Sequence, residues 1–237
     1  MATAPPDHLT LLAELQGRFL ATIGEVDPAT RVPWCGRWRV RDVVVHLARI
    51  HHWAAGQARR RQETPLGRGP FDLPELYGRC AAELLETLRD LGPDAEAWTL
   101  LGKGPASFWH RRQVHETLVH LWDVRAASGL DVDVAPPVWA DTVEEVVAVL
   151  QPRQVRLGRM PRLDASVRLA STDAPGRWLL DTTGEAPDGV AVRAPARTLA
   201  LLLWGRVDPA DAVAAGDATI EGDDALLTDV LAQRLTP

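Results

Sequence analysis

The chain has 237 residues, 46% of them hydrophobic and 24% charged, which is typical of a globular protein that can bury a sizeable core. Its net charge of −6 argues against a nucleic-acid-binding protein, because such proteins normally present a basic face. Two cysteines, Cys35 and Cys80, are too few for a disulfide framework. The first dozen residues do not resemble a secretion signal, and no apolar run approaches the ~20 residues that span a membrane. We therefore expect a cytoplasmic protein that binds neither nucleic acid nor membranes.

Apolar side chains recur at helical spacing through the first 150 residues. Asp72 is a plausible helix N-cap, and Gly92 followed by Pro93 is a typical helix end. The pattern predicts helices over 7–24, 39–60, 72–91, 105–128 and 136–150. The first four have similar lengths and modest connections, which predicts an antiparallel four-helix bundle.

After residue 151 the pattern changes to short segments in which apolar and polar residues alternate. The expected strands are 165–171, 178–181, 189–194 and 217–222, with helices over 195–205 and 223–235. The predicted fold class is therefore α+β, with a helical bundle over 1–152 and a small α+β domain over 163–237.

Three residues of the helical part could bind a metal ion. Glu116 and His120 are four residues apart, so their side chains lie one turn apart on the same helix face. His46 lies on the apolar side of an earlier helix and would supply a third ligand from within the bundle. Zinc accepts such ligands, and a fourth position would stay open. Two ordinary interpretations remain, a solvated Glu/His pair and a hydrogen-bonded core histidine at His46.

Three segments of the sequence resemble a known family. They are Trp38–Leu47 with the following Trp53-Ala54, the helix Arg111–Asp123, and Leu201–Arg206 followed by Gly216-Asp217 and Gly222-Asp223. In order and position they are similar to the mycothiol-dependent maleylpyruvate isomerase family. The resemblance implies a DinB-like four-helix bundle followed by a small α+β domain. It also implies a zinc ion held by His46, Glu116 and His120, with the small thiol mycothiol at the open position.

The resemblance further implies an activity. The metal-bound thiolate would add to a small electrophilic substrate, a carboxylate being one candidate, in a cis–trans isomerase or a thiol S-transferase. Arg206 matches an arginine important for activity in the family and is the expected catalytic residue. The alternatives are a metal-dependent hydrolase on the same bundle and a non-catalytic metal-binding or regulatory protein.

Two further residues of the same helix border the expected metal face. Gln113 lies three residues before Glu116 and is expected to line the cofactor pocket. Asp123 lies three residues after His120, so it is either an acceptor for the ligand histidine or a surface charge. We assign both to cofactor binding. His51 and His52 are expected at the surface or at an interface.

Overall fold

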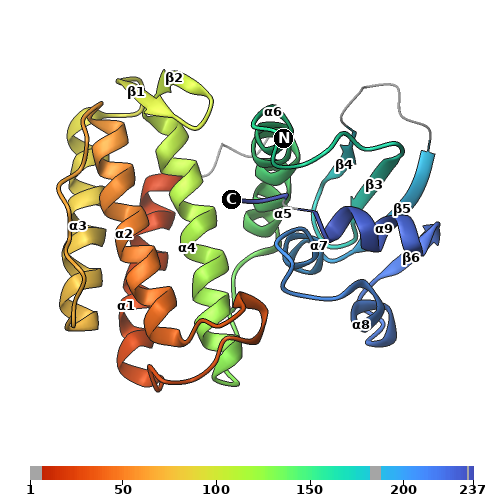
Figure 1. The fold of residues 1–237 in the computed structure, drawn as a ribbon, viewed down its shortest axis with the longest axis horizontal. Helices are drawn as coiled ribbons and strands as arrows, with labels where there is room; N and C mark the ends of the chain where they lie inside the picture. The colour runs from red at the N-terminus through yellow and green to blue at the C-terminus, as the bar shows by residue number, and fades with distance from the viewer. Residues whose placement is uncertain (1–6, 182–187, 234) are drawn as a thin grey trace. The chain divides into compact units, whose positions relative to one another are not determined.

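The computed structural model describes residues 7–181, 188–233 and 235–237, and its chain forms two compact units, Met1–Val132 and Asp133–Pro237. The first unit is helical apart from one hairpin, whereas the second combines helices with a four-stranded sheet (Figure 1). The predicted α+β class, with a helical part followed by an α+β part, is confirmed. No helix of the described residues is both long enough and apolar enough to cross a membrane.

Four long helices account for most of the first unit as described. They are α1 (His8–Glu25), α2 (Val40–Ala58), α3 (Leu73–Leu91) and α4 (Ser107–Ala127). The side chain of Asp72 accepts the backbone N–H of Glu75 at 2.9 Å, so it is the predicted N-cap of α3. Gly92 ends the same helix with a φ of 70°, a conformation that glycine adopts readily.

The bundle contains two parallel helix pairs, so its helices do not simply alternate in direction. Arg60, just after α2, forms an ion pair with Glu96, just after α3, which places both helix ends together. Likewise the Nη1 atom of Arg125, near the end of α4, lies 3.3 Å from Oε2 of Glu25 at the end of α1. Each pair packs antiparallel against the other, α1 with α3 and α2 with α4 (Figure 1).

The connection between α2 and α3 explains how two consecutive helices can run in parallel. A helix of 19 residues is about 28 Å long, and the 14 residues from 59 to 72 can span about 46 Å when extended. This linker therefore returns along the full length of the bundle, as Figure 1 shows. The modest loop predicted from the sequence would instead have made α3 an antiparallel neighbour of α2.

Short elements complete the first unit. A hairpin of β1 (Glu96–Thr99) and β2 (Gly102–Pro105) joins α3 to α4, and a 3₁₀ turn, η1 (Pro33–Cys35), lies between α1 and α2. The hairpin was not predicted, because β2 consists of Gly-Lys-Gly-Pro and shows no apolar alternation. The bundle core is formed by fully buried apolar side chains from all four helices, including Leu12, Phe19, Leu47, Leu84 and Leu118.

The second unit begins with a helical stretch, α5 (Pro136–Glu145), the π turn η2 (Val146–Leu150) and α6 (Gln151–Arg156). Its sheet has the order β4-β3-β5-β6, in which β3 and β5 are parallel and the other pairs antiparallel. The strands and remaining helices are β3 (Ser166–Ser171), β4 (Arg177–Leu180), β5 (Asp188–Ala194), α7 (Ala196–Leu203), α8 (Pro209–Ala214), β6 (Thr219–Gly222) and α9 (Asp224–Leu231).

The division between the units lies earlier than the predicted boundary near 152–163. Helix α5 packs against α7, which is itself in contact with β3 and β5. The helix over 136–150 therefore belongs to the second unit, and the division falls after Val132. The sequence shows an apolar face on this helix but does not indicate which unit that face packs against.

Candidate metal centre

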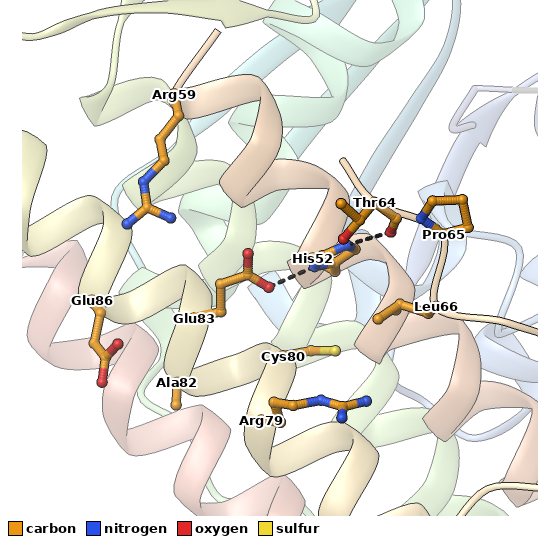
Figure 2. A pocket seen from close by; sticks show the side chains of 10 residues that line it. All are labelled: His52, Arg59, Thr64, Pro65, Leu66, Arg79, Cys80, Ala82, Glu83 and Glu86. Atoms are coloured by element: carbon orange, nitrogen blue, oxygen red, sulfur yellow. Dashed lines mark hydrogen bonds and ion pairs between the residues drawn. The ribbon is translucent and has the colours of Figure 1, made fainter. Parts of the chain in front are cut away.

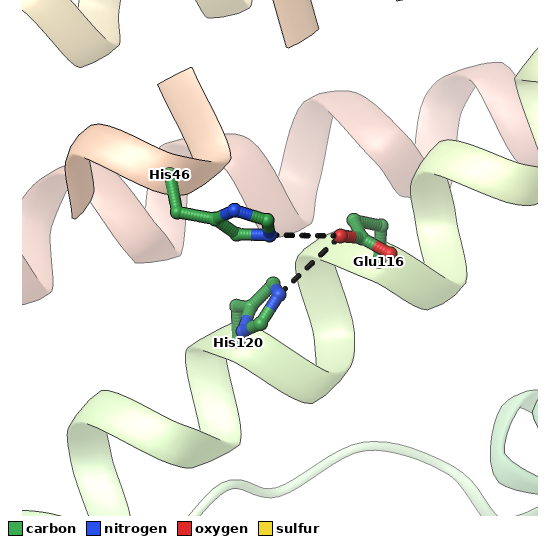
Figure 3. Close-up of side chains that lie close together, drawn as sticks. All are labelled: His46, Glu116 and His120. Atoms are coloured by element: carbon green, nitrogen blue, oxygen red, sulfur yellow. Dashed lines mark hydrogen bonds and ion pairs between the residues drawn. The ribbon is translucent and has the colours of Figure 1, made fainter. Parts of the chain in front are cut away.

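His46, Glu116 and His120 come together between α2 and α4. Figure 3 shows both imidazoles directed at the carboxylate of Glu116. The Nε2 atom of His46 lies 3.4 Å from Glu116 Oε1, and that of His120 lies 3.3 Å from the same oxygen. One potential ligand atom from each residue lies within 4.8 Å of the other two. The antiparallel packing of α2 on α4 thus joins residues 70 positions apart in the sequence.

The three side chains differ in their access to solvent. Glu116 and His120 are 5% and 4% exposed, so they are not a solvated surface pair. The side chain of His46 is 30% exposed, which makes it the outermost of the three. The indole of Trp38 packs on its ring with the centroids 4.9 Å apart. Within the first unit, the accessible side of the cluster is therefore the side of His46.

Asp123 fixes the orientation of His120. It is fully buried, and its Oδ2 atom accepts a hydrogen bond of 2.8 Å from Nδ1 of His120. The structure thus decides between the two alternatives for Asp123 in favour of the buried acceptor. Burial alone would lower the pKa of His120, but the bond to Asp123 and the contact with Glu116 raise it above its usual range. In the neutral imidazole, the bond to Asp123 keeps the one proton on Nδ1, which leaves the lone pair of Nε2 for a ligand.

The second carboxylate oxygen of Glu116 pairs with an arginine side chain. Arg112 lies one turn earlier on α4, is itself buried, and pairs with Oε2 of Glu116. Burial would raise the pKa of the Glu116 carboxyl, yet the charge of Arg112 and the two histidines lower it well below the usual value. Glu116 is therefore a carboxylate with Oε1 directed at the histidines.

Gln113 is buried beside this cluster but binds another histidine. Its Oε1 atom accepts a hydrogen bond of 2.7 Å from Nδ1 of His51, which is fully buried. Burial lowers the pKa of His51 to about 4, so His51 is neutral at pH 7. Of the two positions expected for His51 and His52, the surface is excluded, because both side chains are buried in the bundle. Both lie on inward-facing positions of α2, whose burial the apolar pattern did not reveal.

A separate hollow of about 730 Å³ lies between α2, α3 and the 59–72 linker (Figure 2). His52 lies in its wall, with Nδ1 2.5 Å from Glu83 Oε2 and Nε2 2.8 Å from the carbonyl oxygen of Thr64. None of the three clustered ligand residues lines this hollow. Both ring nitrogens of His52 already contact protein oxygens. We therefore assign no ligand to this hollow.

Arg206, the predicted catalytic residue, lies in the second unit after α7. Its Nη1 atom donates a hydrogen bond of 2.7 Å to the carbonyl oxygen of Trp204, and its guanidinium lies 5.6 Å from the Trp204 ring centroid. It is half-buried. These contacts hold the guanidinium in place, and its role toward a substrate stays a prediction.

The donor set of the cluster fits a divalent metal such as zinc. It offers two imidazole nitrogens and one carboxylate oxygen, which are common zinc ligands, and three protein ligands leave one coordination position open. The bond from His120 to Asp123 is the kind of outer hydrogen bond that orients metal-binding histidines. Among the described residues, no other group of three such side chains meets the same spacing.

Comparisons with known proteins agree with this architecture. Residues 9–125 match the mycothiol maleylpyruvate isomerase N-terminal domain, and residues 133–229 match the C-terminal domain of the same enzyme family. A crystal structure of a mycothiol-dependent maleylpyruvate isomerase aligns with a TM-score of 0.62 at 17% identity, over 88% of this chain and 94% of that one.

A second structure, of a histidine-to-alanine mutant of a mycothiol-dependent maleylpyruvate isomerase, gives the same TM-score at 16% identity, over 93% and 96% of the two chains. At these identities the likeness shows a shared fold. No curated protein matches significantly. The two domain matches together cover most of the sequence, in the family's order. The chain therefore belongs to the mycothiol-dependent maleylpyruvate isomerase family.

Proposed function

We propose that this chain is a zinc-dependent enzyme that uses mycothiol to isomerise a small electrophilic substrate with a cis double bond. The observation that carries the proposal is the convergence of His46, Glu116 and His120, with one accessible side. Family membership supports the choice of thiol, because mycothiol dependence is part of the name of both solved relatives. A cis–trans isomerase is favoured over an S-transferase for the same reason.

The residues around the cluster have distinct tasks in this proposal. His46, Glu116 and His120 would hold the zinc ion, which would lower the pKa of a thiol so that its sulfur is a nucleophile at neutral pH. Asp123 keeps the proton of His120 on Nδ1, away from the metal. Arg112 balances the charge of Glu116 and binds the oxygen that faces away from the histidines.

The proposed reaction needs no net redox change. When bound, the thiolate would supply a nucleophilic sulfur that adds reversibly to the conjugated cis double bond, which would make that bond single and free to rotate. Loss of the same thiolate would then leave the trans isomer, so that no co-reactant is consumed.

Arg206, which the resemblance implies is catalytic, is proposed to act by binding the substrate. A guanidinium can bind a carboxylate through two parallel hydrogen bonds, which a lysine ammonium cannot reproduce. We expect Arg206→Lys to raise KM for an anionic substrate by about tenfold, the loss of roughly 1.4 kcal/mol. The zinc content of this variant should equal that of the wild type. An unchanged KM would remove Arg206 from the proposal.

The first test is the metal content of the purified protein, measured by inductively coupled plasma mass spectrometry. We expect about one zinc per chain, and loss of the metal in His46→Ala and in His120→Ala with helical circular dichroism retained. His110→Ala is the matched control, because His110 is also a buried histidine of α4 and lies outside the cluster. A wild-type protein that binds no zinc after dialysis against it would contradict the proposal.

The second test is thiol dependence of the zinc-loaded protein. We expect isomerisation of a cis-configured, conjugated keto acid only when mycothiol is present, with the substrate's ultraviolet absorbance as the readout. Turnover of an ester or amide without any thiol would instead indicate the hydrolase alternative, in which water occupies the open metal position.

A further inference from the structure

Asp123 is bound by a segment that lies far from it in the sequence. The Nε1 atom of Trp34, in the turn η1, donates a hydrogen bond of 2.5 Å to Oδ1 of Asp123. The Sγ atom of Cys35 lies 3.6 Å from Oδ2 of the same carboxylate, on the oxygen that accepts the His120 bond. Both oxygens of Asp123 therefore have donors, and the carboxylate is fixed against rotation.

The bond from Trp34 matters because of where Asp123 lies. A fully buried carboxylate is costly unless hydrogen bonds replace its hydration. An indole N–H can only donate, so it favours a carboxylate that is ionised and presents Oδ1 to it. The ionised carboxylate with Oδ2 directed at Nδ1 is also the state that holds His120 with Nε2 facing Glu116.

Trp34 is itself held by contacts on two sides. Its ring packs on Trp122 of α4, with the ring centroids 4.7 Å apart. The backbone of the turn is closed by hydrogen bonds from the Cys35 N–H to the Val32 carbonyl at 3.0 Å and from the Trp38 N–H to the Cys35 carbonyl at 3.1 Å. The indole N–H is thus presented to Asp123 by a closed turn and an aromatic contact.

We propose that Trp34 is a positioning residue of the metal centre, which acts through Asp123 on the ring of His120. The chain of contacts runs from Trp34 Nε1 to Asp123, from Asp123 to His120 Nδ1, and from there to the nitrogen that faces Glu116. This inference rests on the proposed function in one respect, namely that His120 is a zinc ligand. It adds the α1–α2 connection to the parts of the chain that determine zinc affinity.

The test is the zinc dissociation constant of Trp34→Phe, measured by competition with a chromogenic chelator. Phenylalanine keeps one aromatic ring to pack against Trp122 but lacks the second ring of the indole and its N–H. Loss of an outer hydrogen bond costs about 10- to 100-fold in metal affinity, so we expect the lower end, about tenfold, for a residue one bond further out. Trp53→Phe is the matched control. Trp53 also packs against a tryptophan of α4, Trp109, but it is Trp34 that donates the hydrogen bond to Asp123. Its zinc affinity should equal that of the wild type.

A double-mutant cycle separates action through Asp123 from a general packing effect. In an Asp123→Ala background, whose fold is checked by circular dichroism, adding Trp34→Phe should change zinc affinity less than twofold. Should Asp123→Ala not fold, Asp123→Asn replaces it, and the effect of Trp34→Phe should shrink there. Equal effects of Trp34→Phe in both backgrounds, or no effect in the wild-type background, would overturn the inference.

The wild-type measurement keeps the two proposals apart. A wild-type protein without zinc affinity would contradict the proposed function itself. Normal zinc binding in the wild type together with unchanged affinity in Trp34→Phe would overturn only the role of Trp34. The cobalt-loaded proteins give an independent signature, because a change in the ligand geometry at His120 alters the visible absorption bands of the metal.

Discussion

The neutral state of His51 links the stability of the helical bundle to pH. The pKa of this buried histidine is about 4, whereas in the unfolded chain it lies near 6.5. Between these two pH values the unfolded state binds more protons than the folded state, so the free energy of unfolding falls as the pH is lowered. The gap corresponds to about 3 kcal/mol at most, all of it lost below pH 4.

This dependence can be measured by urea unfolding at pH 7, 5.5 and 4.5. In His51→Gln the side chain at this position no longer titrates, so the loss of stability between pH 7 and 4.5 should be smaller than in the wild type by about 2 kcal/mol. Parallel pH profiles of His51→Gln and the wild type would contradict the assignment.

At the scale of single residues, the sequence is most informative where spacing alone places side chains. The four-residue interval between Glu116 and His120 puts both on one face of a helix, and His46 was identified from its apolar neighbours. The bond from Trp34 to Asp123 joins residues 89 positions apart and depends on how two segments pack. No local pattern marks such a donor, so the sequence alone does not single out Trp34.

At the scale of elements, the linker between α2 and α3 is held by two side chains of α2. His52 contacts the Thr64 carbonyl oxygen at 2.8 Å, and Arg49 donates a hydrogen bond of 3.0 Å to that of Gly67. Both ring nitrogens of His52 face oxygen acceptors, since Glu83 lies at the other one (Figure 2). The glycine- and proline-rich part of this linker thus lies along the bundle.

Removal of the His52 ring should loosen this linker. The linker contains arginines at which trypsin cleaves, and cleavage follows the population of locally opened chains when opening is fast. Loss of about 1 kcal/mol of hydrogen bonding in His52→Ala should raise that population, and the rate of cleavage between residues 59 and 68, about fivefold. The measurement is limited trypsin digestion followed by mass spectrometry of the fragments. His8→Gln is the control variant and should be cleaved at the wild-type rate. A wild-type cleavage rate in His52→Ala would show that His52 does not hold the linker.

The ends of an element could be predicted where the sequence carries strong helix-capping signals. They could not be predicted where the apolar pattern is weak. The N-cap at Asp72 and the stop at Gly92 define α3 in both sequence and structure. The directions of the helices were not predictable, because a 14-residue linker permits either orientation of the next helix. The π turn η2 lies just before Pro152, which has no N–H for a regular helical bond.

At the scale of the whole molecule, the candidate metal centre belongs to one unit of the chain. Its ligands lie on α2 and α4, Asp123 on α4, and Trp34 in the turn before α2. All of these residues fall within Met1–Val132, whereas Arg206 falls in Asp133–Pro237. Metal binding and the proposed recognition of substrate are thus assigned to different units, and they should respond separately to changes in the chain.

This division predicts the behaviour of a fragment that ends at Val132. Such a fragment keeps the three metal-binding residues and the hydrogen bonds that link Trp34 to Asp123 and Asp123 to His120. It should therefore bind about one zinc ion, with a dissociation constant within threefold of that of the full chain. It lacks Arg206 and should not turn over substrate. Zinc affinity is measured by chelator competition, after circular dichroism has shown helical structure. A folded fragment without zinc affinity would mean that residues beyond Val132 take part in forming the metal centre.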